Sequence, residues 1–593
     1  MKQIDATAVL LGLASALSVS YSIISDCDEV FNYWEPTHFI AFHKGMQTWE
    51  YSPQYALRSY AYLLPLAGLA KLLALIGFAR PLIWFILRGV LAISCAIIQG
   101  SLISALGSAV SPLVARYALL AFICSPGHVL ASSPLLPSST FMQLSMLVWT
   151  LWLRNRCALA VGVAVFATVA TNWPFAALLF VPFMLDVFLA KGIVWSVVWG
   201  LLWGAHVTAP VVLVDYVFYG RWLASPLNIA MYNTGIGAGE SAAGRSVLYG
   251  VESWHYYATN LLLNFHVWVP LAALGAVVMA VRCCSRQKKE KGMTGVAAPS
   301  ARRFTFVVLS PLLIWLAVMF RLPHKEERFL FVIYPLISIA AACGCEAIHN
   351  AEGFFCGGAA KVPGKADQDI AASSSKPVAM SLLRLVLRGL RVGMWCGLLL
   401  GASLTVSRVA GLYVYYGRPV FRVWERTMAA VEKEESKSVS ACTGADWHRY
   451  PSSFFLHERA ELRFVRAGFK GLLPGVFNST SSIPPGMNDD NREDPHKYVS
   501  ISECDYLVDS TDQPLAANAP RPREKLMQLN GDAIAADQLA FESVSCYPIL
   551  EAAMSRAPYR SFLIPPWSIE THEGRNTFVQ MCVWKVVAGR TTD

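Results

Sequence analysis

Charged residues are scarce in this sequence. Of its 593 residues only 15% are Asp, Glu, Lys or Arg, whereas 55% are hydrophobic. A soluble globular protein carries roughly 25% charged residues. This shortage excludes an ordinary soluble enzyme and predicts a chain that crosses a membrane many times. The sequence also lacks basic runs interleaved with aromatic residues, which argues against nucleic acid as a partner, so the net charge of +9 is assigned to membrane topology.

Cysteine pairs with metal-binding spacing are missing from the polar C-terminal part. Ten of the fourteen cysteines precede residue 400, mostly in apolar runs, where packing explains them. The other four are Cys442, Cys504, Cys546 and Cys582. They have no CxxC spacing, which argues against a zinc site. In an oxidising compartment they could form disulfides in three different pairings, and spacing favours none of them.

Long apolar runs predict a mainly α, polytopic membrane protein with about eleven spans. The first run, Thr7 to Ile24, is read as a retained span because the small-residue pattern of a signal-peptide cleavage site is poor. The remaining runs lie at 82–106, 113–130, 137–153, 157–172, 174–190, 192–218, 262–283, 303–320, 329–347 and 380–404. The segment 56–77 holds two cations and is expected to lie on the membrane surface. A broken hairpin is expected around Asn172.

Basic loops set the orientation. Residues 154–156 and 282–303 and the Gly/Ala/Ser/Lys linker 349–378 are expected to face the cytosol. The segment 25–60 and the turn 321–328 then share the opposite face. We expect residues 1–409 to form the membrane domain and 410–593 an α+β domain on that same face. Asn478 begins an N-glycosylation sequon, which agrees with a position in the secretory lumen.

An acidic stretch follows the first predicted span at once. Residues 26–38 contain four carboxylates interleaved with aromatic side chains, and no basic partner lies nearby in sequence. Carboxylates at a membrane boundary are costly unless they have partners or a function. Asp28, Asp26 and Glu29 are therefore candidate catalytic residues. The alternative is a solvated loop with an interfacial aromatic belt.

A charged turn interrupts two apolar runs on the same predicted face. It contains the cations His324, Lys325 and Arg328 together with Glu326 and Glu327. Arg can bind phosphate oxygens in a fork and Lys supplies a point charge, so the turn is a candidate phosphate site. The glutamates could orient these cations or bind sugar hydroxyls. The alternative is an interfacial turn that contacts lipid headgroups.

Carboxylates opposite a phosphate clamp suit the transfer of a sugar from a lipid phosphate to a hydroxyl. A carboxylate general base takes the proton of the acceptor hydroxyl, and cations stabilise the leaving phosphate. A monophosphate lipid leaves without a metal, so no metal or other cofactor is expected. Asp26 and Asp28 do have the spacing of a DxD metal motif, and metal binding there is the less favoured alternative.

These stretches resemble glycosyltransferase family 22 of the GT-C superfamily. The resemblance rests on 26–38, on 47–53 and on 324–329, with support from 172–175, 248–257 and 447–455. Within that family the first two stretches are most similar to the α-1,2-mannosyltransferases of dolichol-linked oligosaccharide assembly. Asn172 stands where the family often has Gly, and the linker 349–378 resembles an insertion.

The resemblance implies a GT-C helical bundle in the endoplasmic reticulum membrane, with its active site in the lumen. Its substrates would be dolichyl phosphate mannose and a dolichyl-diphosphate oligosaccharide, and its product an inverted α-1,2 linkage. Asp28 would act as base, and the turn 324–328 would hold the donor phosphate. Trp34, Glu35 and Trp254 would contact glycan or lipid. The alternatives are an α-1,6 or GPI-anchor mannosyltransferase and, in another class, a lipid transporter or scramblase.

Overall fold

The structure is a computed structural model of the whole chain. It describes residues 2–21, 23–24, 26–234, 248–284, 299–356, 376–435, 438–477, 486–514, 521–523, 539–557, 559–563 and 575–588. The predicted glycosylation site Asn478 lies outside these residues.

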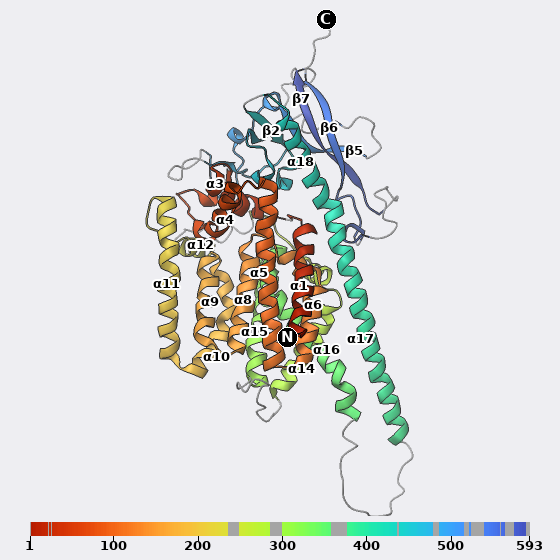
Figure 1. Ribbon diagram of the computed structural model, residues 1–593. Helices are drawn as coiled ribbons and strands as arrows, with labels where there is room; N and C mark the ends of the chain where they lie inside the picture. The colour runs from red at the N-terminus through yellow and green to blue at the C-terminus, as the bar shows by residue number, and fades with distance from the viewer. Residues whose placement is uncertain are drawn as a thin grey trace, which may run out of the picture.

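A bundle of apolar helices forms the larger part of the molecule (Figure 1). The α-helices are α1 Lys2–Tyr21, α2 Cys27–Glu29, α3 Glu35–Phe42, α4 Leu64–Leu75, α5 Arg80–Ala109, α6 Pro112–Ile123, α7 Pro126–Ala131, α8 Pro137–Leu153, α9 Cys157–Ala170, α10 Val181–Lys191, α11 Ile193–Tyr219, α12 Ser225–Thr234, α13 His255–Phe265, α14 Trp268–Cys284, α15 Ala301–Arg321, α16 Tyr334–Cys356, α17 Lys376–Leu412 and α18 Arg418–Glu432. Single turns of π-helix at Val30–Trp34 and Tyr413–Gly417 lead into α3 and α18.

Six of the described helices are long and apolar enough to cross a membrane, or seven if the bent pair α13 and α14 counts as one span. Shorter apolar helices cover the predicted runs 7–24, 113–130 and 157–172. The helical membrane class is therefore confirmed, and the count of about eleven spans stays a prediction.

The structure changes one local prediction and confirms another. The predicted surface helix 56–77 begins only at Leu64, because Pro65 in the first turn favours a helix start there. The break at Asn172 is present between α9 and the 3₁₀ turn Pro174–Phe180. Asn172 has a φ of 56°, a left-handed conformation that asparagine tolerates better than most residues, and its side chain donates to the Leu57 carbonyl at 2.6 Å. This explains how Asn can replace the Gly often found there.

Glycines let two helices approach closely behind the charged turn. A Cβ atom on Gly275 of α14 would lie 1.7 Å from the Ala340 carbonyl oxygen of α16, and one on Gly344 would lie 2.3 Å from the Leu271 carbonyl oxygen. Small residues are what such backbone contact requires. The 3₁₀ segment Glu327–Ile333 runs directly into α16. The α14–α16 contact therefore fixes the position of the charged turn.

A mixed five-stranded sheet forms the C-terminal part. Its strands are ordered β3 Ala460–Phe464, β2 Val439–Thr443, β5 Tyr506–Pro514, β7 Phe578–Ala588 and β6 Leu539–Leu550. The first three strands are parallel, and β7 is antiparallel to both β5 and β6. The structure also selects one of the three disulfide pairings, Cys442–Cys504 with Cys546–Cys582.

Two predicted boundaries fall inside helices. The division at 409/410 lies within a helical run from Met380 to Glu432, so the chain passes from the bundle to the sheet without a break. In Figure 1 α17 rises along one flank of the bundle and α18 continues it to the sheet. The linker expected at 349–378 is helical up to Cys356 and again from Lys376, and residues 357–375 lie outside the described part.

Candidate active site

The acidic stretch folds into short helical turns at the end of the bundle that carries the sheet (Figure 1). Asp26 is the N-cap of α2, and its Oδ1 accepts from the backbone N–H of Asp28 at 2.9 Å. Asp is a preferred N-cap because its oxygen satisfies an otherwise unpaired N–H. The π-helical turn at Val30 to Trp34 follows directly. The backbone thereby fixes both carboxylates at one place.

Arg328 joins the acidic stretch to the charged turn across 300 residues of sequence. Its guanidinium contacts Asp26 Oδ2 at 2.7 Å and Asp28 Oδ2 at 2.6 Å, and it is also paired with Glu326. The two stretches predicted to share one face are thus in direct contact. Arg328 lies between three carboxylates, however, and both of its terminal nitrogens are paired with them.

The two aspartates have different electrostatic environments. Burial raises the pKa of Asp26 to about 7 despite the opposing charge of Arg328. Burial would raise the pKa of Asp28 as well, yet the charge and hydrogen bond of Arg328 hold it below its usual range. Oδ1 of Asp28 has no hydrogen-bond partner among the described residues, and its side chain is 39% exposed. Asp28 is therefore the ionised carboxylate with an open oxygen.

The cations of the predicted phosphate clamp have protein partners. His324 contacts the Gly250 carbonyl at 3.1 Å and Glu326 Oε1 at 2.8 Å, and the hydrogen bond to Glu326 raises the pKa of His324. Lys325 is 6% exposed and donates to the carbonyls of Glu252 and Leu322. These contacts make the turn rigid.

The two glutamates of the turn point to different partners. Glu326 bridges His324 and Arg328, which agrees with the expectation that it orients cations. Glu327 accepts from Asn264 of α13 at 2.8 Å. The charged turn is therefore bound on one side to the acidic stretch and on the other to α13.

Three residues of the acidic stretch lie inside the protein. Glu29 is 1% exposed and accepts from the indole N–H of Trp34 and from the backbone N–H of Leu135. Trp34 and Glu35 are both 0% exposed. Glu35 accepts hydrogen bonds from Met46, Ser452 and Ser453. The contact with glycan or lipid predicted for Trp34 and Glu35 does not fit this burial.

Trp254 differs from those two. Its side chain is 57% exposed and its ring stacks on His255 with centroids 3.9 Å apart. It follows Glu252, whose carbonyl holds Lys325. An exposed indole beside the charged turn has the surface that a sugar or lipid contact requires.

Sequence analysis missed an ion pair that lies against the acidic stretch. Arg58 forms a two-pronged contact with Glu50, at 3.0 Å for each pair of atoms, and donates to the Tyr33 hydroxyl at 2.7 Å. Its positive charge also helps to lower the pKa of Asp28. The signal in the sequence was a pair of opposite charges eight positions apart in a nearly uncharged stretch. We had assigned Arg58 to a surface helix.

Three potential metal ligands gather at the start of α2. Ligand atoms of Asp26, Cys27 and Asp28 lie within 4.8 Å of one another. Both carboxylates are also paired with Arg328, whose positive charge occupies the place of a cation. The absence of a metal requirement stays a prediction.

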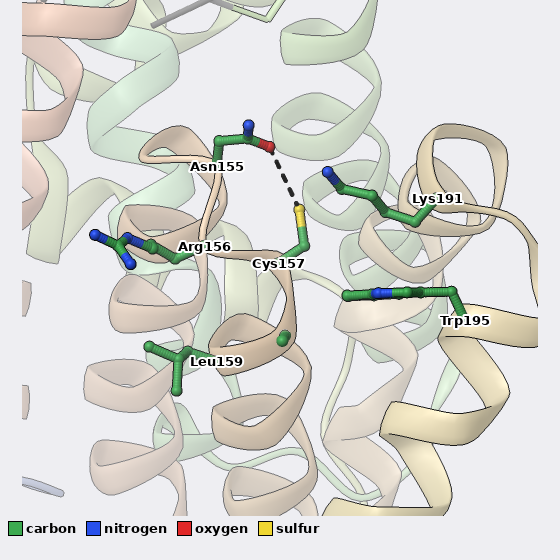
Figure 2. A pocket seen from close by; sticks show the side chains of 7 residues that line it. Asn155, Arg156, Cys157, Leu159, Lys191 and Trp195 are labelled. Atoms are coloured by element: carbon green, nitrogen blue, oxygen red, sulfur yellow. Dashed lines mark hydrogen bonds between the residues drawn. The ribbon is translucent and has the colours of Figure 1, made fainter.

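A cavity of about 270 Å³ lies between the α8–α9 loop and the ends of α10 and α11, away from the candidate site. Figure 2 shows the amine of Lys191 and the sulfur of Cys157 near the same space, with Trp195 beside them. No predicted site residue lines this cavity.

The fold and site define the class. ArnT from Cupriavidus metallidurans, in a crystal structure bound to undecaprenyl phosphate, matches with a TM-score of 0.51 at 12% identity, over 98% of this chain and 97% of that chain. The chain therefore shares the overall fold of that protein, and its acidic site lies at one end of the helical bundle.

The chain belongs to the Alg9-like mannosyltransferase family, whose model matches residues 7–457. It is 33% identical to the α-1,2-mannosyltransferase ALG9 of Mus musculus, over 92% of this chain and 83% of the relative. It is 33% identical to the same enzyme of Arabidopsis thaliana, over 93% and 86%. The resemblance to glycosyltransferase family 22 is confirmed.

Proposed function

We propose that this α-1,2-mannosyltransferase transfers mannose from dolichyl phosphate β-mannose to a dolichyl-diphosphate-linked oligomannose, in the assembly of the N-glycan precursor. The transfer takes place on the lumenal face of the endoplasmic reticulum membrane. Relatives named α-1,2-mannosyltransferase, matched over most of both chains, favour this linkage over the α-1,6 and GPI-anchor alternatives. A lipid transporter or scramblase has no support from these relatives.

The carboxylate oxygen of Asp28 that has no hydrogen-bond partner among the described residues acts as the general base. In a single displacement, the acceptor hydroxyl attacks the anomeric carbon of mannose from the side opposite the phosphate. Its proton passes to Asp28, the C–O bond to phosphate breaks, and the bonding electrons leave with the phosphate. The β-linked donor thereby gives an α-linked product. A general base contributes roughly 10²- to 10⁴-fold to such a reaction.

The other residues position the base. Arg328 and Arg58 keep Asp28 ionised, and the N-cap bond to Asp26 Oδ1 fixes the backbone N–H of Asp28. Asp26 has both oxygens engaged, one in the cap and one on Arg328, which makes it the second candidate for the base. Trp254 offers an exposed ring to the glycan or lipid. No metal takes part in this mechanism.

The experiment is mannose transfer by the purified full chain from synthetic dolichyl phosphate mannose to a dolichyl-diphosphate oligomannose. We expect transfer by the wild type, and transfer that is slower by at least 10²-fold by an Asp28→Asn variant that remains folded. Transfer to a GPI precursor, with none to this acceptor, would contradict the proposed pathway. Undiminished transfer by the variant would assign the base to another residue.

A further inference from the structure

The leaving phosphate needs a positive group with free donors, and the charged turn offers few. Arg328 is paired with three carboxylates, and Lys325 donates to two carbonyls. His324 is held by Glu326 and a backbone carbonyl. The residues predicted as the phosphate clamp are therefore engaged with the protein itself.

Arg408 is a buried cation near the sheet end of α17, and not all of its N–H donors are used by the described residues. It is 5% exposed, and its Nε donates to Asn264 Oδ1 at 3.3 Å. Its terminal nitrogens make no hydrogen bond with a described residue, and they are not among the wholly enclosed polar atoms. A buried guanidinium with unused N–H groups is costly unless an anion pairs with it.

The position of Arg408 is fixed from both sides of the helix. Thr405 donates to the Cys124 carbonyl at 2.8 Å, and Ser407 donates to the Leu563 carbonyl at 2.9 Å. These bonds tie α17 both to the bundle and to the C-terminal part. The stretch of α17 that carries Arg408 is thus held in place before any ligand arrives.

Asn264 connects Arg408 to the active site. Its Oδ1 accepts from Arg408, while its Nδ2 donates to Glu327, the neighbour of Arg328. Glu327 is the acidic group that acts most strongly on Arg408, but the two form no ion pair. Arg408 and the proposed base Asp28 are therefore linked through three residues, Asn264, Glu327 and Arg328.

A second unused polar atom lies in the same region. Nε2 of His266, at the break between α13 and α14, is buried with no hydrogen-bond partner, and the charge of Arg408 acts on this ring. Arg408 and the unpaired Nε2 of His266 thus lie in one region beside the upper part of α17.

We propose that Arg408 binds the phosphate of a polyprenyl-phosphate lipid, as a site separate from the turn 321–328. This inference rests on the proposed function. In the transfer reaction the donor phosphodiester becomes a phosphate monoester and gains one negative charge. The parallel N–H donors of a guanidinium stabilise the phosphate monoester product more than the phosphodiester substrate. The acceptor's diphosphate has the same chemistry, so the experiment must distinguish the two lipids.

The first measurement is binding. Short-chain polyprenyl phosphate and polyprenyl diphosphate are each added to the purified full chain, and the thermal shift is recorded. We expect the stabilisation of the wild type to be lost in Arg408→Ala for one of the two lipids. Arg408→Lys keeps the positive charge but cannot donate two parallel hydrogen bonds to the phosphate, so this variant should bind that lipid with intermediate strength.

The second measurement is kinetic. Arg408→Ala should raise KM for one lipid substrate, with kcat/KM falling about 10- to 100-fold, as expected for hydrogen bonds to a charged group. A rise confined to the donor identifies its monophosphate as the ligand. A rise confined to the acceptor identifies the diphosphate.

The matched control is Arg388→Ala, the same change on the same helix. Arg388 is 67% exposed and pairs with Glu352 at 3.0 Å, so neither binding nor KM should change. Unchanged binding and KM in Arg408→Ala would overturn the inference, as would equal losses in both variants. A wild type that binds the lipids and transfers no mannose would instead overturn the proposed function, because the binding result stands by itself.

Discussion

The backbone N–H of Ser453 donates to the carboxylate of Glu35 at 2.6 Å, across 418 residues of sequence. Glu35 lies seven residues after Asp28, and Ser453 lies just before β3. Nearby, Lys44 donates to the carbonyls of Glu458 and Ala460. The C-terminal part therefore contacts the acidic stretch directly and holds it in place.

Removing the Glu35 carboxylate should destabilise that contact strongly. Glu35→Ala leaves four buried donor groups without their acceptor. At roughly 1–3 kcal/mol for each unsatisfied group, we expect a loss of more than 3 kcal/mol. The apparent melting temperature and the rate of limited proteolysis measure it. Glu458→Ala is the control, because that side chain is 72% exposed. Equal stability of the two variants would contradict the prediction.

Asp28→Asn should reduce mannose transfer by at least 10²-fold, because the amide cannot accept the proton. It should also lower the melting temperature, because the ionised carboxylate pairs with Arg328. Asp490→Asn serves as the control, since the side chain of Asp490 is partly exposed and forms an ion pair with Arg492. Initial rates at saturating donor and acceptor separate loss of chemistry from loss of binding. A tenfold loss or less would show that Asp28 is not the base.

Asp26 should make stability depend on pH. The pKa of Asp26 is about 7 in the folded protein, above that of an Asp in an unfolded chain. At pH values between these two pKa values, the folded state keeps a proton on Asp26 that the unfolded state has lost. Its contribution to stability is complete below pH 4 and is lost as the pH rises through 7, by at most about 1.4 kcal/mol per pH unit. Melting temperatures of the wild type and Asp26→Asn between pH 5 and 8 test this. Parallel curves would contradict it.

Chelation should leave transfer unchanged. Arg328 already bridges the carboxylates of Asp26 and Asp28, so no divalent cation is needed to hold them together. Rates after treatment with EDTA should equal untreated rates, and added Mn²⁺ or Mg²⁺ should not raise them. Loss of activity on chelation, restored by one of these metals, would assign a metal to Asp26 and Asp28.

The two disulfides should stabilise the sheet. They close segments with sequence separations of 62 and 36 residues, which corresponds to roughly 4 kcal/mol each in the chain-entropy account. The double variant Cys442→Ser/Cys504→Ser should unfold at a lower temperature than the wild type. Added reductant should then lower its melting temperature further only by breaking the Cys546–Cys582 disulfide. Alkylation followed by peptide mass analysis checks the pairing, and a Cys442–Cys546 link would contradict it.

Much of the site followed from local sequence. The cluster of carboxylates at 26–35 and of cations at 324–328 was visible because charge is rare in an apolar chain and each such group needs a partner or a function. Their common face followed from the number of spans between them and from the basic loops. Trp34 and Glu35 were misjudged, because a buried carboxylate held by serines 417 and 418 residues away has no local signature.

The sequence by itself determined the membrane class, the family and the residues between which the base had to be sought. Tertiary structure alone decided that Arg328 contacts Asp26 and Asp28, that the cations of the turn are engaged, and that Arg408 has donors left over. It also decided which cysteines pair. The physical reason is distance along the chain: hydropathy and charge are local properties of a segment, whereas pairing and burial depend on which distant segments pack against it.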